Sequence, residues 1–333
     1  MRVAILGATG EVGRTMLRVL EERAFPVDEL VLLASERSAG KRVSWRGREW
    51  TVQAPAPGVF RGCDIALFSA GASRSREWGP RAAEEGAVVI DNSSAWRMDP
   101  EVPLVVPEVN ARRIAERPRG IIANPNCSTI QLVLALEALR RAAGLRRVVA
   151  TTFQSVSGAG HKGVAALQAE LAGKTPEASP FPAPIAGNVI PWIGPRNAAG
   201  WNEEEEKMRN ESRKILELPE LAVAATCVRV PVEVGHSVAA TVETERPLSI
   251  DEARAALQAM PGVELMEGDC DPLPRDVAGT DVVRVGRLRA DPDFPNVLHL
   301  WVVADNLRKG AATNAVQIAE HLLRERTTSP SKA

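Results

Sequence analysis

The chain has 333 residues, of which 45% are hydrophobic and 25% are charged, so its composition is that of a globular protein with room for about two domains. With 41 basic and 42 acidic residues the formal net charge is −1, which argues against the positive surface of a nucleic-acid-binding protein. No apolar run reaches the roughly 18–20 residues of a membrane span, and the chain begins on a strand pattern without the marks of a signal peptide. We therefore expect a cytoplasmic protein that binds neither nucleic acid nor membrane.

The first part of the chain alternates short apolar runs with helical patterns. Strands are predicted at residues 2–6, 30–33, 64–68, 87–90 and 121–123, and a helix at 11–22. Continuous apolar runs separated by helices are typical of a parallel sheet that is covered on both faces. The pattern predicts an α/β, Rossmann-like, doubly wound domain.

The pattern changes after Cys127. A helix is predicted at residues 130–142, and longer strands with alternating polarity at 147–155, 224–232, 237–244, 281–287 and 297–304. Alternation indicates an antiparallel or mixed sheet with one face in water, as in an α+β domain. The stretch 174–200 is rich in proline and has no periodicity, so we expect a functional or interfacial loop. A last helix is predicted at 311–326.

Three glycines follow the first predicted strand with the spacing G-x-x-G-x-x-G. Gly7 permits a tight turn, Gly10 lets the backbone approach a pyrophosphate, and Gly13 lets the helix pack on the sheet. The phosphates would rest on the N-terminus of the helix, where N–H groups and the helix dipole favour anions. We therefore predict a nucleotide site at this turn; its residues are Gly7, Thr9, Gly10, Glu11, Val12 and Gly13.

The end of the second strand favours NADP over NAD. An NAD enzyme would carry an acidic residue there for the ribose hydroxyls. Instead, Ser35, Arg37, Ser38 and Lys41 are side chains that can hold a 2′-phosphate. Glu36 conflicts with this interpretation unless its carboxylate points away.

Cys127 is the candidate nucleophile among four cysteines, which show no C-x-x-C spacing and no zinc pattern, so no metal site is predicted. It follows a strand and begins a helix, where the helix N-terminus should lower the pKa of the thiol. Free N–H groups nearby could hold an oxyanion. The alternative is a helix cap with an incidental cysteine. Packing roles are expected for Cys63 and Cys227, and an exposed position for Cys270.

Eight segments together resemble the aspartate-semialdehyde dehydrogenase family over essentially the whole chain. They are residues 7–13, 35–41, 91–97, 124–129, 152–160, 203–216, 227–230 with 235–236, and 305–310. The family reduces aspartyl 4-phosphate to aspartate semialdehyde with NADPH in lysine, threonine and methionine biosynthesis, releasing phosphate. The resemblance implies an NADP-binding domain of residues 1–126 with helix 311–326 returning to it. It also implies a catalytic and dimerisation domain of 127–310, a flexible tail at 327–333, and a homodimer or possible tetramer.

The resemblance also implies residue roles. Cys127 would form the acyl-enzyme, His236 would be the acid/base, and Gln154 would orient the substrate or thioester. Arg229 would bind the substrate carboxylate and Glu204 its amino group, while Arg97 and Lys207 would hold phosphate. Ser157 and Gly158 would approach the nicotinamide, and Asn314 or Gln317 would complete the cofactor site.

The residues alone leave alternatives open. Glu203 or Glu205 could replace Glu204, His161 rivals His236, and Arg97 could be an ordinary surface cation. Two other functions compete: reduction of N-acetyl-glutamyl phosphate, whose substrate has no free amino group, and a non-catalytic nucleotide-binding paralogue. The second requires the loss of catalytic side chains that this chain retains.

Overall fold

The computed structural model describes residues 1–268 and 270–328, and the chain forms two compact units. The first unit comprises residues 1–125 together with the chain from Ala311 on, and the second comprises Asn126–Gly310. Of the tail predicted at 327–333, residues 329–333 lie outside the described residues, and 327 and 328 still belong to the last helix.

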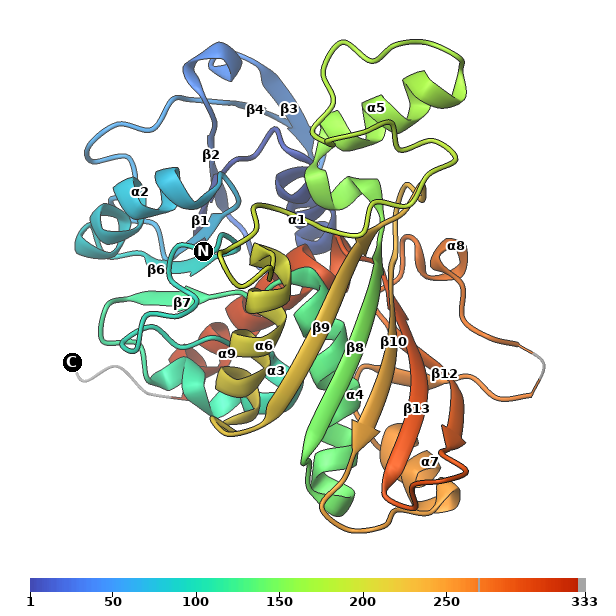
Figure 1. Ribbon diagram of the computed structural model, residues 1–333. Helices are drawn as coiled ribbons and strands as arrows, with labels where there is room; N and C mark the ends of the chain where they lie inside the picture. The colour runs from blue at the N-terminus through green and yellow to red at the C-terminus, as the bar shows by residue number, and fades with distance from the viewer. Residues whose placement is uncertain (269, 329–333) are drawn as a thin grey trace. The chain divides into compact units, whose positions relative to one another are not determined.

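The first unit is built on a five-stranded parallel sheet with the order β2-β1-β5-β6-β7 (Figure 1). Its strands are β1 (Arg2–Leu6), β2 (Glu29–Leu33), β5 (Ile65–Phe68), β6 (Val88–Asp91) and β7 (Ile121–Ala123), each within one residue of its predicted bounds. Every neighbouring pair is parallel. The expected doubly wound class is confirmed.

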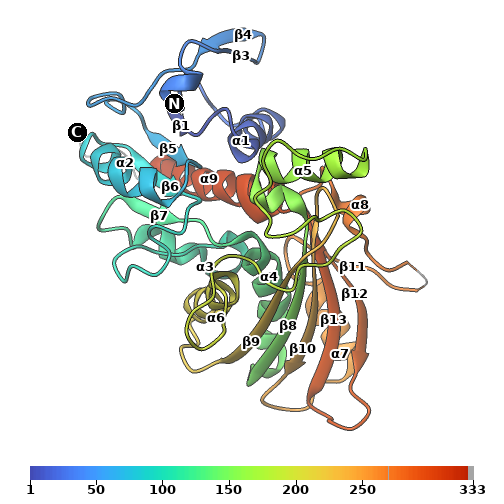
Figure 2. The same ribbon diagram turned by 45° about the horizontal axis from the view of Figure 1, so that its top comes forward.

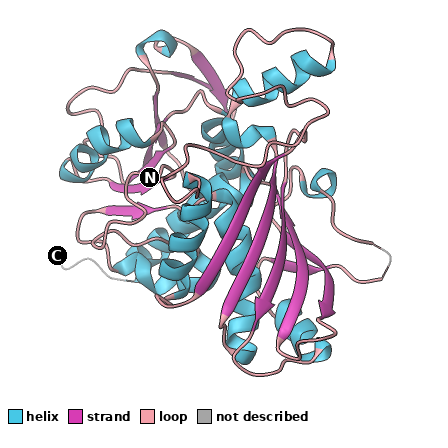
Figure 3. Cartoon of the chain, viewed as in Figure 1, coloured by secondary structure: helices cyan, strands magenta, loops and turns pink. Residues whose placement is uncertain are grey.

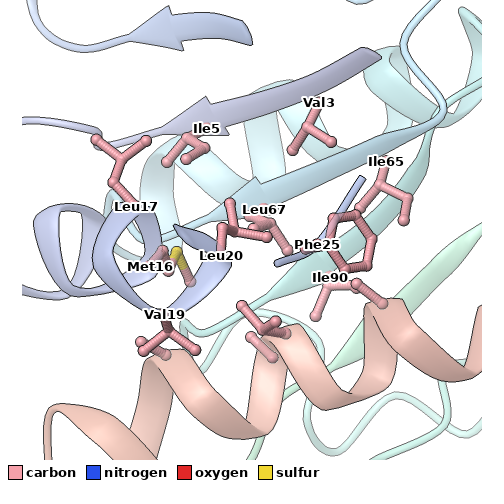
Figure 4. Packing of buried hydrophobic residues seen from close by; sticks show 14 of the residues in the cluster. Val3, Ile5, Met16, Leu17, Val19, Leu20, Phe25, Ile65, Leu67 and Ile90 are labelled. Carbon is pink, nitrogen blue, oxygen red and sulfur yellow. The ribbon is translucent and has the colours of Figure 1, made fainter. Parts of the chain in front are cut away.

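Helices α1 (Glu11–Glu22), α2 (Ala72–Glu84) and α9 (Thr313–Thr328) belong to this unit, with short turns η1 (Glu36–Ser38), α3 (Pro107–Asn110) and η2 (Ala111–Ala115). One core cluster joins β1, β5, α1 and α9, and Figure 4 shows Ile5, Leu67, Met16 and Leu20 pointing into it. Helix α9 begins at Thr313, two residues later than predicted, because the π-helical turn η4 (Arg308–Ala312) precedes it.

A short hairpin in this unit escaped the sequence analysis. Strands β3 (Arg42–Trp45) and β4 (Arg48–Thr51) pair antiparallel around Arg46 and Gly47, both of which have positive φ. Trp45 anchors the hairpin, since its indole N–H donates to the carbonyl of Leu17 at 2.7 Å.

The second unit contains a six-stranded mixed sheet with the order β11-β12-β13-β10-β8-β9. Its strands are β8 (Arg147–Gln154), β9 (Ala222–Arg229), β10 (His236–Glu243), β11 (Val263–Leu265), β12 (Val283–Ala290) and β13 (Val297–Ala304). Pairs β8–β9 and β11–β12 are parallel and the others antiparallel, so the mixed sheet is confirmed. Strand β9 ends three residues before its predicted end, because Pro231 has no N–H for a ladder.

Helices α4 (Cys127–Ala143) and α7 (Ile250–Gln258) pack on one face of this sheet, as Figures 1 and 2 show. Helix α6 (Glu203–Leu216) packs on β9 and α4. The unit also has η3 (Val156–Ala159), α5 (His161–Leu171) and α8 (Pro274–Val277). Residues 172–202 form the long loop between α5 and α6 (Figure 3), as predicted for 174–200.

In the part of the chain that the structure describes, every helix falls short of the length or apolarity that a bilayer crossing requires. Within residues 1–268 and 270–328, no group of three or more His, Cys, Asp or Glu side chains is placed to hold a metal ion.

Candidate active site

The turn between β1 and α1 has the geometry of a dinucleotide-binding loop. Gly7 has a φ of +92°, and a Cβ there would lie 2.2 Å from the carbonyl oxygen of Ser69. A Cβ on Gly13 would lie 2.2 Å from the carbonyl oxygen of Gly7, so the close approach of helix and strand requires glycine. Gly10 is the N-cap of α1 and has no side chain to occupy the N–H groups of the first turn.

A cavity of about 450 Å³ opens beside this loop within the first unit. Of the predicted cofactor residues, Gly7, Thr9, Gly10 and Ser35 line it, together with Glu36. Other lining residues, for which the sequence analysis made no prediction, include Pro55, Arg74, Glu77 and Trp78. A turn that requires glycine at Gly7 and Gly13, a helix N-terminus without a side-chain cap, and a cavity at the carboxyl ends of parallel strands fit a dinucleotide.

The residues after β2 lie partly in the cavity lining. Glu36 lines the cavity, so the acidic residue that conflicts with the NADP interpretation belongs to the surroundings of the candidate cofactor site. Arg37 is exposed and Ser38 is buried; both follow in η1 and stand outside the lining. Glu11 and Val12 are half-buried in the first turn of α1.

Arg97 is buried, so the surface-cation alternative is wrong. Its side chain is only 7% exposed. The guanidinium Nε donates to the carbonyl of Asn124 at 3.0 Å, and Nη2 donates to the carbonyl of Asn92 at 2.7 Å. Backbone carbonyls therefore hold this cation at the end of β6.

Two residues of α9 bond to the same unit. Asn314 is fully buried, and its Nδ2 donates to the carbonyl of Val105 at 2.9 Å and to Oδ1 of Asn124 at 2.6 Å. Gln317 is half-buried, and its Nε2 donates to Glu108 at 2.8 Å. The amide of Asn314 thus ties α9 to the segment before Cys127.

Cys127 is the first residue of α4, and Asn126 caps the helix. Oδ1 of Asn126 accepts from the N–H groups of Ser128 and Thr129 at 2.9 and 3.3 Å. These two amides are therefore occupied, and the expectation that free N–H groups of this helix end hold an oxyanion is wrong for both of them. The helix cap and the cysteine coexist rather than exclude each other.

Asn126 also connects this helix end to α6. Its Nδ2 donates to Oε1 of Glu204 at 2.6 Å, and its backbone N–H donates to Glu211 at 2.7 Å. Glu204 is 7% exposed, and its second oxygen lies 3.3 Å from Nζ of Lys207. Lys207 also pairs with Glu203 at 2.8 Å. Helix α6 thus places a buried carboxylate and an ammonium beside the residue that precedes the cysteine.

Arg229, the last residue of β9, is the buried cation of this region. Its Nη1 donates to the carbonyl of Ser155 at 2.6 Å. Burial lowers the pKa of Arg229, and the charges of Glu204 and Cys127 act in the opposite direction. Arg229 therefore lies within electrostatic range of both the carboxylate and the candidate nucleophile.

His236 begins β10 and is completely buried, whereas its rival His161 is exposed at the start of α5. Nδ1 accepts from the backbone N–H of Ser155 at 3.1 Å. Within the described residues, Nε2 has no hydrogen-bond partner. A Cβ on Gly158 would lie 3.2 Å from this Nε2 and 2.9 Å from Nη1 of Arg229, so Gly158 leaves space where both side chains converge.

Gln154 and Ser157 flank the histidine. Gln154 ends β8, is buried, and donates from Nε2 to Oγ1 of Thr152 at 3.2 Å. Ser157 is buried as well, and its Oγ accepts from Nδ2 of Asn306 at 2.9 Å. The second unit therefore contains eight of the predicted site residues, which are Cys127, Gln154, Ser157, Gly158, Glu204, Lys207, Arg229 and His236.

The other cysteines have the expected surroundings. Cys63 and Cys227 are buried and Cys270 is exposed. Burial raises the pKa of both the Cys63 and the Cys227 thiols, so both stay protonated at neutral pH.

Four further residues contact the site. Asn126 was expected from the sequence as a helix cap, and no role was predicted for the other three. Asn126 and Glu211 anchor the start of α4, and Asn306 bonds to Ser155 and Ser157. A Cβ on Gly310 would lie 2.9 Å from Cβ of Cys127, so a glycine must stand there. Asn306 and Gly310 lie inside the segment 305–310 used for the family resemblance, which is the one signal that pointed to them.

The long loop 172–202 contributes to a cavity of about 470 Å³ that reaches Arg229. Phe181, Ile190 and Trp192 supply its apolar wall. The loop therefore contributes to the surroundings of Arg229, and its functional or interfacial role stays a prediction.

Comparison with known proteins identifies the family. Residues 2–117 match the family model of the semialdehyde dehydrogenase NAD binding domain, and residues 136–309 match the semialdehyde dehydrogenase dimerisation domain. An aspartate-semialdehyde dehydrogenase of Aquifex aeolicus is 55% identical, over 97% of this chain and 98% of its own length.

Solved structures agree. The aspartate semialdehyde dehydrogenase II of Vibrio cholerae complexed with ASA is 50% identical with a TM-score of 0.93, over 97% of this chain and 98% of that chain. The Candida albicans aspartate semialdehyde dehydrogenase with NADP is 27% identical with a TM-score of 0.77, over 97% and 98%. The first unit thus carries a nicotinamide-cofactor domain. The chain belongs to the aspartate-semialdehyde dehydrogenase family.

Proposed function

We propose that this protein catalyses the NADPH-dependent reduction of aspartyl 4-phosphate to aspartate 4-semialdehyde and phosphate, through a thioester on Cys127. The observation that carries the proposal is the convergence of four buried or half-buried groups in the second unit. Arg229 is within electrostatic range of Cys127 and Glu204, and Gly158 leaves space between Arg229 and Nε2 of His236. A nucleophile, two binding charges and an acid/base are the parts that this reaction needs.

The sulfur of Cys127 forms a bond to the acyl carbon, and the bond from that carbon to the phosphate oxygen breaks. When bound, the dinucleotide supplies the hydride that reduces the thioester. His236 exchanges a proton with the substrate oxygen or the thiol as the carbon–sulfur bond breaks and the aldehyde leaves. General acid/base help of this kind is worth about 10²–10⁴ in rate.

Binding of the substrate is assigned to complementary charges. The fork of Arg229 suits the α-carboxylate, and the carboxylate of Glu204 suits the amino group. Arg97 and Lys207 hold the phosphate group, and Gln154 orients the thioester. Glu204 favours aspartyl over N-acetyl-glutamyl phosphate, because an acetylated amine carries no positive charge for it to bind.

For the cofactor we propose NADP, as in the Candida albicans relative. The loop residues Gly7, Thr9, Gly10, Glu11, Val12 and Gly13 hold the pyrophosphate; Ser35, Arg37 and Ser38 hold the 2′-phosphate; Ser157, Gly158, Asn314 and Gln317 complete the site. Residues 1–126 with helix 311–326 form the NADP-binding domain, and 127–310 the catalytic and dimerisation domain.

We propose that the protein is a homodimer that uses the sheet face opposite α4 and α7. Strand β8 alternates between buried and exposed side chains, and Val149 on its outer side is 37% exposed. Phe294, at the edge of a cavity of about 470 Å³ that Val149 also lines, is 63% exposed. Exposed apolar side chains that lie together on one face, such as Val149 and Phe294, favour a protein partner there.

The test is NADP reduction by aspartate semialdehyde in phosphate buffer, with N-acetyl-glutamate semialdehyde as the competing substrate. We expect turnover with the first only. Cys127→Ser should abolish turnover and preserve NADP binding, while Cys270→Ser, a change at an exposed cysteine, should leave both intact. Near-normal turnover of Cys127→Ser, or cofactor binding by the wild type without hydride transfer, would overturn the proposal.

A further inference from the structure

Arg229 is a buried cation whose hydrogen-bonding capacity is mostly unused within the protein. It is 6% exposed, and among the described residues its side chain forms no ion pair and a single hydrogen bond, from Nη1 to the carbonyl of Ser155. A guanidinium carries five N–H donors, and buried charges are normally paired. The remaining donors of Arg229 therefore suit an anionic ligand, so the question is what keeps the side chain in place for it.

The long loop 172–202 pairs with the backbone of Arg229. The N–H of Ile190 donates to the carbonyl of Arg229 at 3.0 Å, and the N–H of Arg229 donates to the carbonyl of Ile190 at 2.9 Å. The side chain of Ile190 is buried in a cluster that also contains Val156, Leu167 and Ile185. The loop is thus attached at the end of β9 where Arg229 lies.

A second attachment connects the loop to α5. One carboxylate oxygen of Glu170, Oε2, accepts from the N–H groups of Ile185 and Ala186 at 2.6 and 2.7 Å. Phe181 lies four residues before this attachment and packs against the same buried cluster. A Cβ on Gly163 of α5 would lie 3.2 Å from Cζ of Phe181, so glycine leaves room for the ring there. The position of Phe181 is therefore set by packing and by a loop that is held on both sides of it.

Phe181 faces the cation of Arg229. The central carbon of the guanidinium lies 5.9 Å from the centre of the phenyl ring, within the range of a cation–π contact. Both residues line the cavity of about 470 Å³ in the second unit. A ring face attracts a cation without occupying its N–H donors, whereas an acidic side chain in the same place would bond to them and compete with an anionic ligand.

We propose that Phe181 is a positioning residue, which holds the guanidinium of Arg229 ready for the carboxylate of the substrate and leaves its donors available. The inference rests on the proposed function, in which Arg229 binds the α-carboxylate. It adds the long loop to the substrate site, through one aromatic side chain that acts on Arg229.

The test is Phe181→Leu, which keeps an apolar side chain and removes the ring face. We expect KM for aspartate semialdehyde to rise by about fivefold to tenfold, within the range for a cation–π contact that is largely shielded from water, while kcat changes by less than about twofold. Phe181→Tyr retains the ring face and should restore KM to within about twofold. Val189→Ala is the matched control: it shortens an exposed apolar side chain of the same loop and should keep wild-type kinetics.

A double-mutant cycle separates positioning of Arg229 from a general effect on the loop. In an Arg229→Ala background the ring has no cation to hold, so Phe181→Leu should change kcat/KM by less than about twofold. A purely structural role of the ring would instead give the same loss in both backgrounds.

NMR of the Arg229 side chain needs no substrate. Its Nε–H signal, assigned by its loss in Arg229→Lys, should shift in Phe181→Leu because the aromatic ring beside the guanidinium is gone. The signal should keep its position in Val189→Ala. This measurement decides the matter if Arg229→Ala has no turnover to measure.

Unchanged KM in Phe181→Leu, an equal rise in Val189→Ala, equal losses in the two backgrounds, or an unmoved Arg229 signal would overturn the inference. A wild type that does not turn over aspartate semialdehyde, in which the Arg229 signal still responds to Phe181→Leu, would support the contact between ring and guanidinium and contradict the proposed function.

Discussion

Four consecutive acidic residues open α6, and three of them have different tasks. Glu203 is exposed and pairs with Lys207. Glu205 completes the capping box with Asn202 and accepts from the backbone N–H of Cys227 at 3.1 Å. Only Glu204 is buried against the residue that precedes Cys127. Its position beside Asn126 supports Glu204 as the candidate for the substrate contact, and the assignment stays a prediction.

Replacing Glu204 by Gln should reduce kcat/KM for aspartate semialdehyde by about 10–100-fold, because a hydrogen bond to a charged group contributes about 1.5–3 kcal/mol. Glu203→Gln is the matched control one residue away, and should stay within about twofold of the wild type. Steady-state kinetics of the two variants decides the assignment. Equal effects would show that general helix charge, and not a specific contact, is responsible.

Arg37→Ala should weaken NADP binding by about tenfold or more and leave NAD binding nearly unchanged, because a lost Arg–phosphate contact affects only the cofactor with a 2′-phosphate. Titration of both cofactors measures this. Arg42→Ala, a nearby exposed arginine at the start of β3, serves as the control. Equal losses for the two cofactors would refute the assignment. Glu36 lines the same cavity, and an acidic residue at this position is typical of NAD binding, so the two cofactors must be compared directly.

The buried His236 should make stability depend on pH. Its pKa is lowered well below 6.5 in the folded protein, by burial first and by Arg229 second. Below about pH 6.5 the unfolded chain therefore binds a proton that the folded chain does not, and the free energy of unfolding falls with falling pH, by up to about 1.4 kcal/mol per pH unit. Stability from this group is fully present above that pH.

Urea unfolding at pH 7.5 and 5.5 measures the difference. Between these two values the wild type should lose about 1 kcal/mol more stability than His236→Gln, which cannot bind the proton in either state. His161→Gln removes an exposed histidine and should keep the wild-type dependence. A wild-type slope in His236→Gln would contradict the prediction.

At the scale of elements, the start of α4 combines a structural cap with the candidate nucleophile, Cys127. Asn126 satisfies two helix N–H groups and at the same time holds Glu204. Helix α7 has a comparable cap, Ser249, whose Oγ accepts from the N–H of Glu252 at 3.2 Å. Asn126 caps the helix that begins with Cys127, and Ser249 caps a different helix. Replacing each of them therefore separates the effect of a lost cap on stability from its effect on activity.

Asn126→Ala and Ser249→Ala should each lower the free energy of unfolding by about 1 kcal/mol, the usual contribution of an N-cap. Activity should fall strongly only in Asn126→Ala, because Glu204 then loses its partner. Chemical denaturation and kinetics on both variants separate stability from function. Comparable loss of activity in Ser249→Ala would mean that stability alone explains the effect.

For the whole molecule, the proposed homodimer depends on the outer face of the mixed sheet. Val149→Asp places a charge on the outward side of β8 and should shift the protein toward monomer, because an unpaired charge at an apolar interface is costly. Light scattering after gel filtration, at several concentrations, measures the mass. Met98→Asp alters an exposed apolar residue of the first unit, and should leave the mass unchanged. An unaltered mass for Val149→Asp would place the interface elsewhere.

Local patterns were sufficient for most of the elements. The bounds of α1 and β1 match the predictions. The spacing of apolar residues and the glycines that end a strand or begin a helix are local properties of the chain. The β3–β4 hairpin was missed because its strands are four residues long and mostly exposed, so they lack an apolar signal. Strand β11, with three residues and no fully buried side chain, was missed for the same reason.

By itself, the sequence determined the two-part α/β architecture, the glycine turn at Gly7–Gly13 and the cysteine at a helix start, since each depends on residues that are neighbours in the chain. Tertiary structure alone decided that Glu204 faces Asn126, that Arg97 is buried, that two helix amides are occupied, and that Ser155 and Asn306 hold His236. Those contacts join residues up to 151 positions apart, and burial and hydrogen bonding at such separations follow from packing rather than from any local pattern.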